Sequence, residues 1–344
     1  MLATEEKMSR LRNASGRGLG LAAAGVLAVL LAACGAATTG SAASTPSSSF
    51  KLQSEYVKLV QDVGPSVVLI ETSVGLGSGI IYDAQGHIVT NNHVVTGSQT
   101  FIVITSNGKQ YQGSLVGTYA PDDLAVIRIQ ASGLHPATFA NSSNLQVGDI
   151  VMAIGNPLGL QSSVSQGIVS AMRTAIPEGN GVTLPSAIQT TAAINPGNSG
   201  GALIDLNEQV VGIPTLAATD PQLGGGAAPG IGFAIPSNTI TLIAKQLIAN
   251  GSVANSGRAA LGAQFGNTGG TGAVVTTVKS GGPAALAGIK VGDIITAIGG
   301  QSVTGAQAVA DVLVTLKPGQ QVTVNVTHSD GTKGAVSVTL TELQ

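Results

Sequence analysis

The sequence predicts a large all-β domain of the barrel or sandwich type, followed by a small domain of mixed α and β structure. Between Ser66 and Ile235, short runs rich in Val and Ile are separated by Gly, Asn, Asp and Pro. Many short strands at near-regular spacing are typical of β-barrels and β-sandwiches. The length of 344 residues also fits about two domains.

Short apolar runs give the strand predictions, and two longer segments show helical spacing. Lys51–Val63 alternates charged and apolar residues with a helical period and stops at Gly64–Pro65. Ser237–Ala249 is predicted to be a second helix, with Ser237 as its N-cap and Gly251 near its end. The predicted strands are Val67–Ile70, Gly79–Tyr82, Phe101–Ile104, Ala125–Ile129, Ile150–Ile154 and Val210–Ile213.

The composition excludes several functional classes. Charged residues make up 9% of the chain, the net charge is −2, and Lys and Arg form no cluster in the body, so nucleic-acid binding has no electrostatic basis. A single cysteine excludes a disulfide within the chain and a cysteine-based metal site. The 4 histidines are not spaced as metal ligands. We therefore predict no metal site, no cofactor and no nucleic-acid partner.

The N-terminal segment has the composition of a secretory signal. Basic residues precede Leu19–Ala33, an apolar run without charge, and the run ends in L-A-A-C at Cys34. This ending resembles the bacterial lipobox, in which the cysteine thiol is lipidated and becomes the mature N-terminus. We expect residues 1–33 to be a signal peptide and Cys34 to carry lipid. The alternatives are a plain signal peptide and an uncleaved anchor, and the start is either Met1 or Met8.

Composition also predicts the domain boundaries. Residues 34–50 are mainly small and polar, so we expect a flexible tether there. Residues 51–250 would form the all-β domain. A stretch that contains Gly, Ser and Asn, residues 251–257, is predicted to link it to the small domain, residues 258–342.

Three residue types in the all-β domain fit nucleophilic catalysis. A serine hydroxyl is a weak nucleophile at neutral pH and needs an imidazole base, which in turn needs a carboxylate to orient it. Ser199 lies in a glycine-rich turn, His93 follows a strand, and Asp123 begins another strand. The order His, Asp, Ser is that of the chymotrypsin-type double barrel. The N–H groups of Gly197 and Ser199 are the expected oxyanion donors.

Strand periodicity selects between two adjacent aspartates, Asp122 and Asp123. Side chains alternate between the faces of a strand, and Arg128 is the single charged residue in Leu124–Ile129. The face opposite Arg128 is therefore the expected interior. Extending the alternation backwards places Asp123 on the inner face, where it can meet the catalytic histidine, and leaves Asp122 in solvent.

Several segments resemble the signature motifs of the HtrA/Deg family of bacterial quality-control proteases. They are T-N-N-H-V-V, D-L-A-V-I, I-N-P-G-N-S-G-G-A-L and G-I-G-F-A-I-P, in that order, within a likeness that covers about residues 52–340. The resemblance implies two six-stranded barrels with the active site between them. It implies His93 as general base, Asp123 as its orienting group, Ser199 as nucleophile, and Gly197 with Ser199 as the oxyanion hole. Family members cleave unfolded or damaged proteins without ATP.

The same resemblance indicates the substrate-binding segment. Trypsin-like enzymes place an aspartate six residues before the nucleophile, but this sequence has Ala193 there, so we expect cleavage after Val, Ala, Ile or Leu. The segment Gly232–Ala234 matches the strand that pairs with substrate backbone, and Ile231 would be a wall of the primary pocket. The predicted substrate-binding residues are Ile231, Gly232, Phe233 and Ala234.

The C-terminal domain resembles a PDZ domain of the HtrA type. Such a domain holds a peptide carboxylate on the backbone N–H groups of a loop and adds the peptide to an open strand edge. Ala260–Gly262 would be that loop, and Leu261 and Ala263 would line the first side-chain pocket. The predicted peptide-binding residues are Ala260, Leu261, Gly262 and Ala263.

These expectations together describe a membrane-tethered protease of the bacterial envelope. Its expected partners are unfolded proteins, C-terminal peptides and, through the lipid, the membrane. Phe50 and Tyr56, the only aromatic residues between the signal and the first strand, suggest a homotrimer. Two other functions stay open at this point: a chaperone or scaffold with a vestigial triad, and a hydrolase that acts on something other than protein.

Overall fold

The structure of the protein, a computed structural model, covers most of the chain that follows the expected tether. The signal peptide predicted for residues 1–33 and the lipid site predicted at Cys34 lie outside the residues that it describes. Among the helices of the described residues, none is both long and apolar enough to cross a membrane. The described residues are 48–156, 163–179, 182–195, 197–220 and 226–343.

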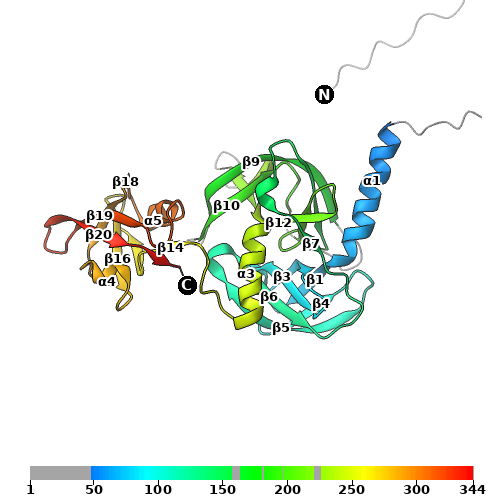
Figure 1. Ribbon diagram of the computed structural model, residues 1–344, viewed down its shortest axis with the longest axis horizontal. Helices are drawn as coiled ribbons and strands as arrows, with labels where there is room; N and C mark the ends of the chain where they lie inside the picture. The colour runs from blue at the N-terminus through cyan, green and yellow to red at the C-terminus, as the bar shows by residue number, and fades with distance from the viewer. Residues whose placement is uncertain (1–47, 157–162, 180–181, 196, 221–225, 344) are drawn as a thin grey trace, which may run out of the picture. The chain divides into compact units, whose positions relative to one another are not determined.

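The first barrel is closed by antiparallel strands in the order β1-β2-β3-β6-β5-β4 (Figure 1). Its interior holds Ala125, Ile127 and Ile129, so the face predicted from the single exposed charge at Arg128 is confirmed. The opposite face of the same strand is also buried, against the core between the barrels. The strands are β1 (Val67–Thr72), β2 (Leu76–Ile81), β3 (His87–Asn91), β4 (Phe101–Ile104), β5 (Gln110–Tyr119) and β6 (Leu124–Ile129).

The second barrel has the ring order β11-β8-β9-β10-β13-β12, and a pairing between β11 and β12 closes it. A short strand, β7, adds to β12 in parallel. The prediction of an all-β chymotrypsin-like double barrel is thereby confirmed. The strands are β7 (Thr138–Phe139), β8 (Ile150–Gly155), β9 (Ser163–Gly179), β10 (Val182–Thr190), β11 (Ala202–Ile204), β12 (Gln209–Asp220) and β13 (Gly226–Pro236).

Helices flank the barrels and join them. Helix α1 (Ser48–Val63) begins three residues before the predicted start. Helix α3 (Ser237–Asn250) packs against β5 and β6 of the first barrel and β12 of the second (Figure 1). The prediction of Ser237 as N-cap was wrong, because Pro236 holds that position and the Ser237 hydroxyl donates to the carbonyl of Ala140. The shorter helices are η1 (Gly64–Ser66), α2 (Asn92–Val95), η2 (Ala120–Asp122) and η3 (Ser142–Asn144).

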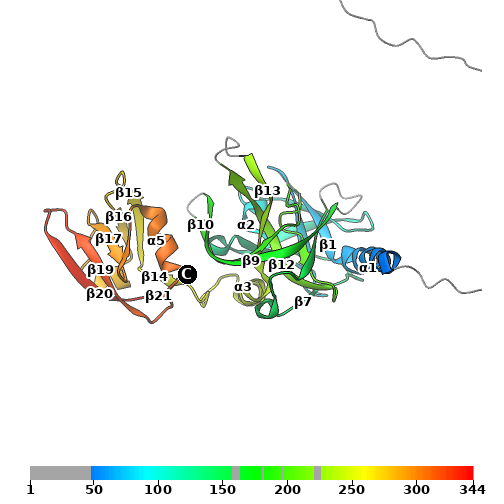
Figure 2. The same ribbon diagram turned by 90° about the horizontal axis from the view of Figure 1, so that it is seen from above.

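The C-terminal domain is a small α+β fold with its own apolar core. Its main sheet has the order β15-β16-β17-β19-β20, so β15 is an edge strand, and helix α5 lies beside it (Figure 2). A second, two-stranded sheet pairs β14 with β21. The elements are β14 (Ala259–Ala260), β15 (Ala263–Asn267), β16 (Ala273–Val278), α4 (Pro283–Leu286), β17 (Ile294–Ile298), β18 (Gln301–Ser302), α5 (Ala306–Leu313), β19 (Gln321–Thr327), β20 (Lys333–Thr339) and β21 (Thr341–Glu342).

Candidate active site

The carboxylate of Asp123 is buried at the end of the η2 turn, and several hydrogen bonds fix its orientation. Asp123 has a left-handed backbone, with φ 49° and ψ 42°, and its N–H donates to the carbonyl of Ala120 at 3.0 Å. Its own carbonyl accepts from the N–H of Asn92 at 2.9 Å and from Asn91 Nδ2 at 3.1 Å. The turn is therefore locked against the segment that carries His93.

The His93 ring meets this carboxylate directly. Nδ1 of His93 lies 2.8 Å from Oδ2 of Asp123, and the His93 N–H donates to Oδ1 at 2.9 Å. An ionised carboxylate only accepts hydrogen bonds, so Nδ1 carries the hydrogen and Nε2 is left as the base. The His93 side chain is 49% exposed, which leaves the ring open to a substrate.

Ser199, the candidate nucleophile, lies in a glycine-containing turn, two of whose N–H groups face no protein acceptor among the described residues. Asn198 N–H donates to the carbonyl of Asn195 at 3.0 Å, and Gly197 has φ 100°, a conformation that glycine adopts without strain. In the described part of the chain, the N–H groups of Gly197 and Ser199 donate to no protein acceptor. Both predicted oxyanion donors are therefore available to a substrate carbonyl.

Ser78 of the first barrel holds the turn of the second barrel in place. Its hydroxyl donates to the carbonyl of Gly197 at 2.5 Å, and its N–H donates to the carbonyl of Ser199 at 2.9 Å. A Cβ at Gly200 would lie 2.1 Å from the carbonyl oxygen of Ser78, so only glycine permits this close approach. Ser78 could not be predicted as a site residue, because nothing in the local sequence marks it.

Thr215 on β12 joins the nucleophile to the carboxylate and was also missed. Its hydroxyl donates to Oδ2 of Asp123 at 2.8 Å, and its carbonyl accepts from Oγ of Ser199 at 3.2 Å. A threonine just beyond a buried apolar run carries no signal of this role in one sequence. The structure thus brings His93, Asp123 and Ser199 to one place, with Thr215 between them.

The prediction that Asp122 is solvated was wrong. Its side chain is only 1% exposed, and Oδ1 lies 2.8 Å from Nη1 of Arg258. Burial raises the pKa of the Asp122 carboxyl, and the Arg258 guanidinium opposes that rise. The alternation along β6 does not extend through η2, because η2 is a helical turn and Asp123 at its end has a left-handed backbone.

The prediction that Gly232–Ala234 pairs with substrate backbone was also wrong. This part of β13 already pairs with β10 on one side and β12 on the other, so it has no free edge. A free edge lies instead on β12 beyond Pro214. There β12 pairs with β13 on one side, and in the described residues no strand pairs with residues 215–217 on the other.

Ile194 lines the second barrel next to the nucleophile turn and is the better candidate for a pocket wall. It is 8% exposed, and a Cβ at Gly232 would lie 2.4 Å from its Cγ1. Side chains alternate along a strand, so Ile231 points to the face opposite the one that Ile194 covers. Ala193, six residues before Ser199, is uncharged and exposed. The structure thus places no acidic group at either of these positions.

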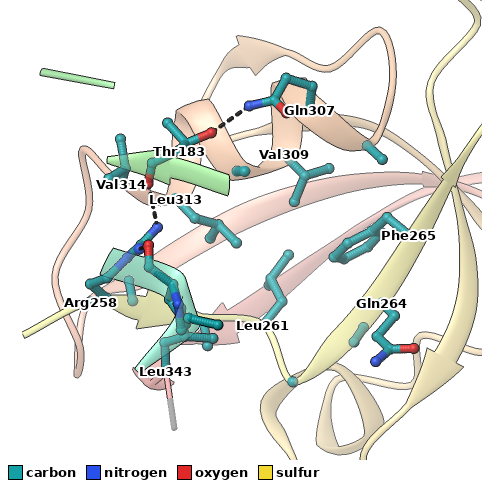
Figure 3. Close-up of a pocket in the computed structure, with 18 of the residues that line it drawn as sticks. Thr183, Arg258, Leu261, Gln264, Phe265, Gln307, Val309, Leu313, Val314 and Leu343 are labelled. Atoms are coloured by element: carbon teal, nitrogen blue, oxygen red, sulfur yellow. Dashed lines mark hydrogen bonds between the residues drawn. The ribbon is translucent and has the colours of Figure 1, made fainter. Parts of the chain in front are cut away.

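An apolar groove of about 660 Å³ lies between β15 and α5 of the C-terminal domain, and Ala120, Pro121 and Thr183 from the barrels also line it (Figure 3). In the described residues, the N–H groups of Leu261 and Gly262 at one end of the groove donate to no protein acceptor. Ala260 belongs to β14 instead of the loop. The apolar side chains that line the groove include Leu261, Ala263, Phe265, Val309 and Leu313.

Known proteins resemble this chain over most of its length. Residues 77–213 match the family described as trypsin-like peptidase domain, and residues 259–340 match the PDZ domain. Serine protease PepD of Mycobacterium tuberculosis is 40% identical over 81% of this chain, which spans 64% of that protein. Serine protease Do-like HtrA of Lactococcus lactis is 38% identical over 77% of this chain and 70% of its own length.

A solved structure agrees with these sequence relatives. The HtrA-type protease AlgW with decapeptide has 30% sequence identity and a TM-score of 0.60, over 84% of this chain and 99% of its own. The fold and the matched domains define a protein with a trypsin-like peptidase domain followed by a PDZ domain. The chain belongs to the HtrA/Deg family, so the family predicted from the sequence motifs is confirmed.

Proposed function

We propose that the protein is an ATP-independent serine endopeptidase of the bacterial envelope that cleaves unfolded or damaged proteins. The observation that carries this proposal is the continuous contact from Ser199 through Thr215 to Asp123 and His93, beside a free strand edge. A vestigial triad has no need of a buried, fully oriented carboxylate. The intact arrangement therefore favours catalysis over a purely binding role.

The geometry supports acyl transfer in two steps. Nε2 of His93 takes the hydroxyl proton as Oγ of Ser199 attacks the scissile carbonyl, and the N–H groups of Gly197 and Ser199 stabilise the oxyanion. The same proton then passes to the departing amine, which leaves an acyl group on Ser199. Water, activated by His93, releases the acyl group. Asp123 holds the tautomer and the orientation of His93 throughout.

Substrate selection follows from the free edge of β12 and from Ile194. A free edge accepts an extended peptide by strand pairing, and folded proteins rarely offer such a segment. Ile194, which packs against Gly232, offers an apolar wall for a small apolar side chain and supplies no charge for Lys or Arg. We therefore infer cleavage of unfolded chains after Val, Ala, Ile or Leu.

The PDZ domain is proposed to bind C-terminal peptides. The unpaired N–H groups of Leu261 and Gly262 would hold the peptide carboxylate, β15 would pair with the peptide, and the apolar groove would take its last side chain. Among the described residues that line the groove, only Arg258 is charged, and it is paired with Asp122. This favours uncharged, apolar peptide ends.

Secretion, a lipid at Cys34 and a homotrimer are further proposals. The basic leader, the apolar run and L-A-A-C support the first two. Metabolic labelling with an alkyne fatty acid should mark the wild type and not Cys34→Ser; equal labelling of both counts against the anchor. For the trimer, light scattering of the soluble form should give three times the chain mass, and a monomer would end that idea.

Mapping of cleavage sites tests the proposed activity. The test substrate is a protein whose fold depends on disulfide bonds. The enzyme should digest this substrate after its disulfides are reduced and it unfolds, and should leave the folded, oxidised form intact. Mass spectrometry should find small aliphatic residues before the cut bonds. Cuts mostly after Lys or Arg, or equal digestion of the folded substrate, would contradict the proposed specificity.

A further inference from the structure

The guanidinium of Arg258 clamps the turn that carries the catalytic aspartate. Nη1 of Arg258 donates to Oδ1 of Asp122 at 2.8 Å and to the carbonyl of Pro121. Nη2 donates to the carbonyl of Thr183 on β10 at 2.9 Å. These three acceptors come from the two barrels, and Arg258 reaches them from the start of the PDZ domain, more than a hundred residues away in sequence from η2.

The turn needs such support because its backbone is unusual. Asp123 is one of only two residues other than glycine with positive φ in the described part of the chain. A left-handed conformation is unfavourable for residues with a Cβ and persists where the surroundings fix it. The η2 turn offers the carbonyl of Pro121 and the carboxylate of Asp122 on its outer side, and Arg258 binds both. The inner side carries the Asp123 carboxylate.

We propose that Arg258 is a positioning residue for catalysis, which holds Asp123 in register with His93 by clamping Pro121 and Asp122 to Thr183. This inference rests on the triad of the proposed function. Arg258 touches none of the reacting atoms and acts through the backbone of the η2 turn. The planar guanidinium group of Arg258 suits this task, because its several N–H donors point in fixed directions and bind three acceptors at once.

The clamp is buried and its charges are matched. The Arg258 side chain is 10% exposed and that of Asp122 is 1% exposed, so water does not replace either partner. Oδ2 of Asp122 has no hydrogen-bond partner, which leaves Arg258 as the one group that compensates this carboxylate within the described residues. Loss of Arg258 would therefore release the outer side of the turn and leave Asp122 uncompensated.

The clamp also touches the PDZ domain at several points. Arg258 immediately precedes β14, and its carbonyl accepts from the N–H of Leu343 at 2.8 Å. Oγ1 of Thr183 donates to Oδ1 of Asp311 at 3.1 Å, and Thr183 Oγ1 accepts from Gln307; both partners lie on α5, the helix that borders the peptide groove (Figure 3). The same residues thus link the groove to the turn of the catalytic aspartate.

Kinetics of the full chain with a short chromogenic peptide test this inference. The variants are Arg258→Ala, Arg258→Lys and the control Arg128→Ala. Arg128 is exposed on β6, the strand that follows Asp123, and its Nε donates to the carbonyl of Gln85. A fluorophosphonate probe counts competent sites, so that kcat refers to folded enzyme. We expect Arg258→Ala to lower kcat roughly tenfold with KM nearly unchanged, because misplacement of catalytic groups by a fraction of an ångström has effects of this size.

The pH profile separates positioning from general destabilisation. The acid limb of kcat/KM reports protonation of the general base, and a nearby carboxylate favours the protonated form. The double variant Arg258→Ala/Asp122→Asn removes both charges of the pair, so in this variant the limb should move to lower pH. Arg258→Lys should restore part of kcat, and Arg128→Ala should match the wild type. A wild-type kcat in Arg258→Ala, or a fall in kcat with an unmoved acid limb in the double variant, overturns the inference.

One further variant separates this inference from the triad itself. Asp123→Asn removes the carboxylate that Arg258 is proposed to position. If Asp123→Asn keeps the wild-type kcat, the triad assignment fails. If Asp123→Asn loses activity while Arg258→Ala does not, the triad stands and only the positioning role of Arg258 is rejected.

Discussion

Thr215 donates its hydroxyl hydrogen to the same carboxylate oxygen of Asp123 that faces the His93 ring. Both contacts to Oδ2 measure 2.8 Å. The carbonyl of Thr215 also accepts from the Ser199 hydroxyl at 3.2 Å. One residue of the second barrel thus orients the carboxylate of the first barrel and contacts the nucleophile, which couples the two halves of the site.

Removal of the Thr215 hydroxyl should lower kcat without unfolding the protein. Thr215→Val has a similar shape but leaves Oδ2 of Asp123 with one donor fewer, and a hydrogen bond to a charged group contributes about 2 kcal/mol. We expect kcat to fall about tenfold or more. Thr215→Ser keeps the hydroxyl and serves as the control, with kcat within a few-fold of wild type. Equal kcat values for the Val and Ser variants would show that this bond is not needed.

The two adjacent aspartates should respond oppositely to the same substitution. Asp123→Asn should lower kcat by about 10⁴, because the amide favours the wrong tautomer of His93. Asp122→Asn should leave kcat within a few-fold, since Arg258 still binds Pro121 and Thr183. It should lower the free energy of unfolding by about 3 kcal/mol, because the buried guanidinium loses its counter-charge. Kinetics and denaturant unfolding of both variants check this, and the reverse order of kcat values would move the catalytic role to Asp122.

Local patterns predicted the parts of the site that lie within single segments. The glycine-rich turn around Ser199, the position of His93 after a strand and the interior face of Leu124–Ile129 all follow from turn chemistry and a period of two. The double barrel follows from the strand spacing and the order of the three residues. The HtrA/Deg motifs gave the same result independently.

Contacts between segments that are far apart in the sequence could not be predicted from local patterns. The pair Asp122–Arg258 joins residues 136 positions apart, and an aspartate beside Pro121 is ordinarily a solvated turn residue. Which strand keeps a free edge depends on how β10, β12 and β13 close the second barrel, and a run of apolar residues does not show that closure. Thr215 was missed for the same reason.

Substitution of Ile194 should change the preferred residue before the cut bond. Ile194→Ala removes the side chain that packs against Gly232 and should enlarge the primary pocket. We expect kcat/KM for a Phe or Met substrate, relative to the Ala substrate, to rise about tenfold, the usual scale for apolar pocket contacts. Ile231→Ala, on the other face of β13, is the matched control and should leave the ratio unchanged. A change of this ratio in Ile231→Ala but not in Ile194→Ala would show that Ile231 forms the wall of the primary pocket.

The stability loss caused by Arg258→Ala should depend on pH. Burial raises the pKa of the Asp122 carboxyl and Arg258 opposes the rise, so without Arg258 the pKa in the folded state rises further. A carboxyl whose folded pKa exceeds the unfolded value of about 3.9 loses stability as pH rises through the folded pKa. The penalty should therefore grow as the pH rises above about 4, and it should be larger at pH 8 than at pH 4.

A double variant isolates the contribution of the carboxyl. In the Asp122→Asn protein there is no carboxyl group at position 122. The loss of unfolding free energy that Arg258→Ala causes in this background should therefore be the same at both pH values. Thermal or urea unfolding at both pH values measures these differences. A penalty of Arg258→Ala that is independent of pH, or that grows toward acid, would contradict the buried pair.

Digestion of unfolded casein by the wild type and by Ser199→Ala tests the catalytic arrangement most directly. Ser199→Ala removes only the hydroxyl group, and the small side chain is half-buried, so the fold should survive with a stability change of about 1 kcal/mol or less. Circular dichroism and the unfolding midpoint establish that both proteins are folded. We expect the wild type to fragment casein and to react with a fluorophosphonate probe, while folded Ser199→Ala does neither. Casein cleavage by the folded Ser199→Ala protein, at a rate near that of the wild type, would contradict the role of Ser199 as nucleophile.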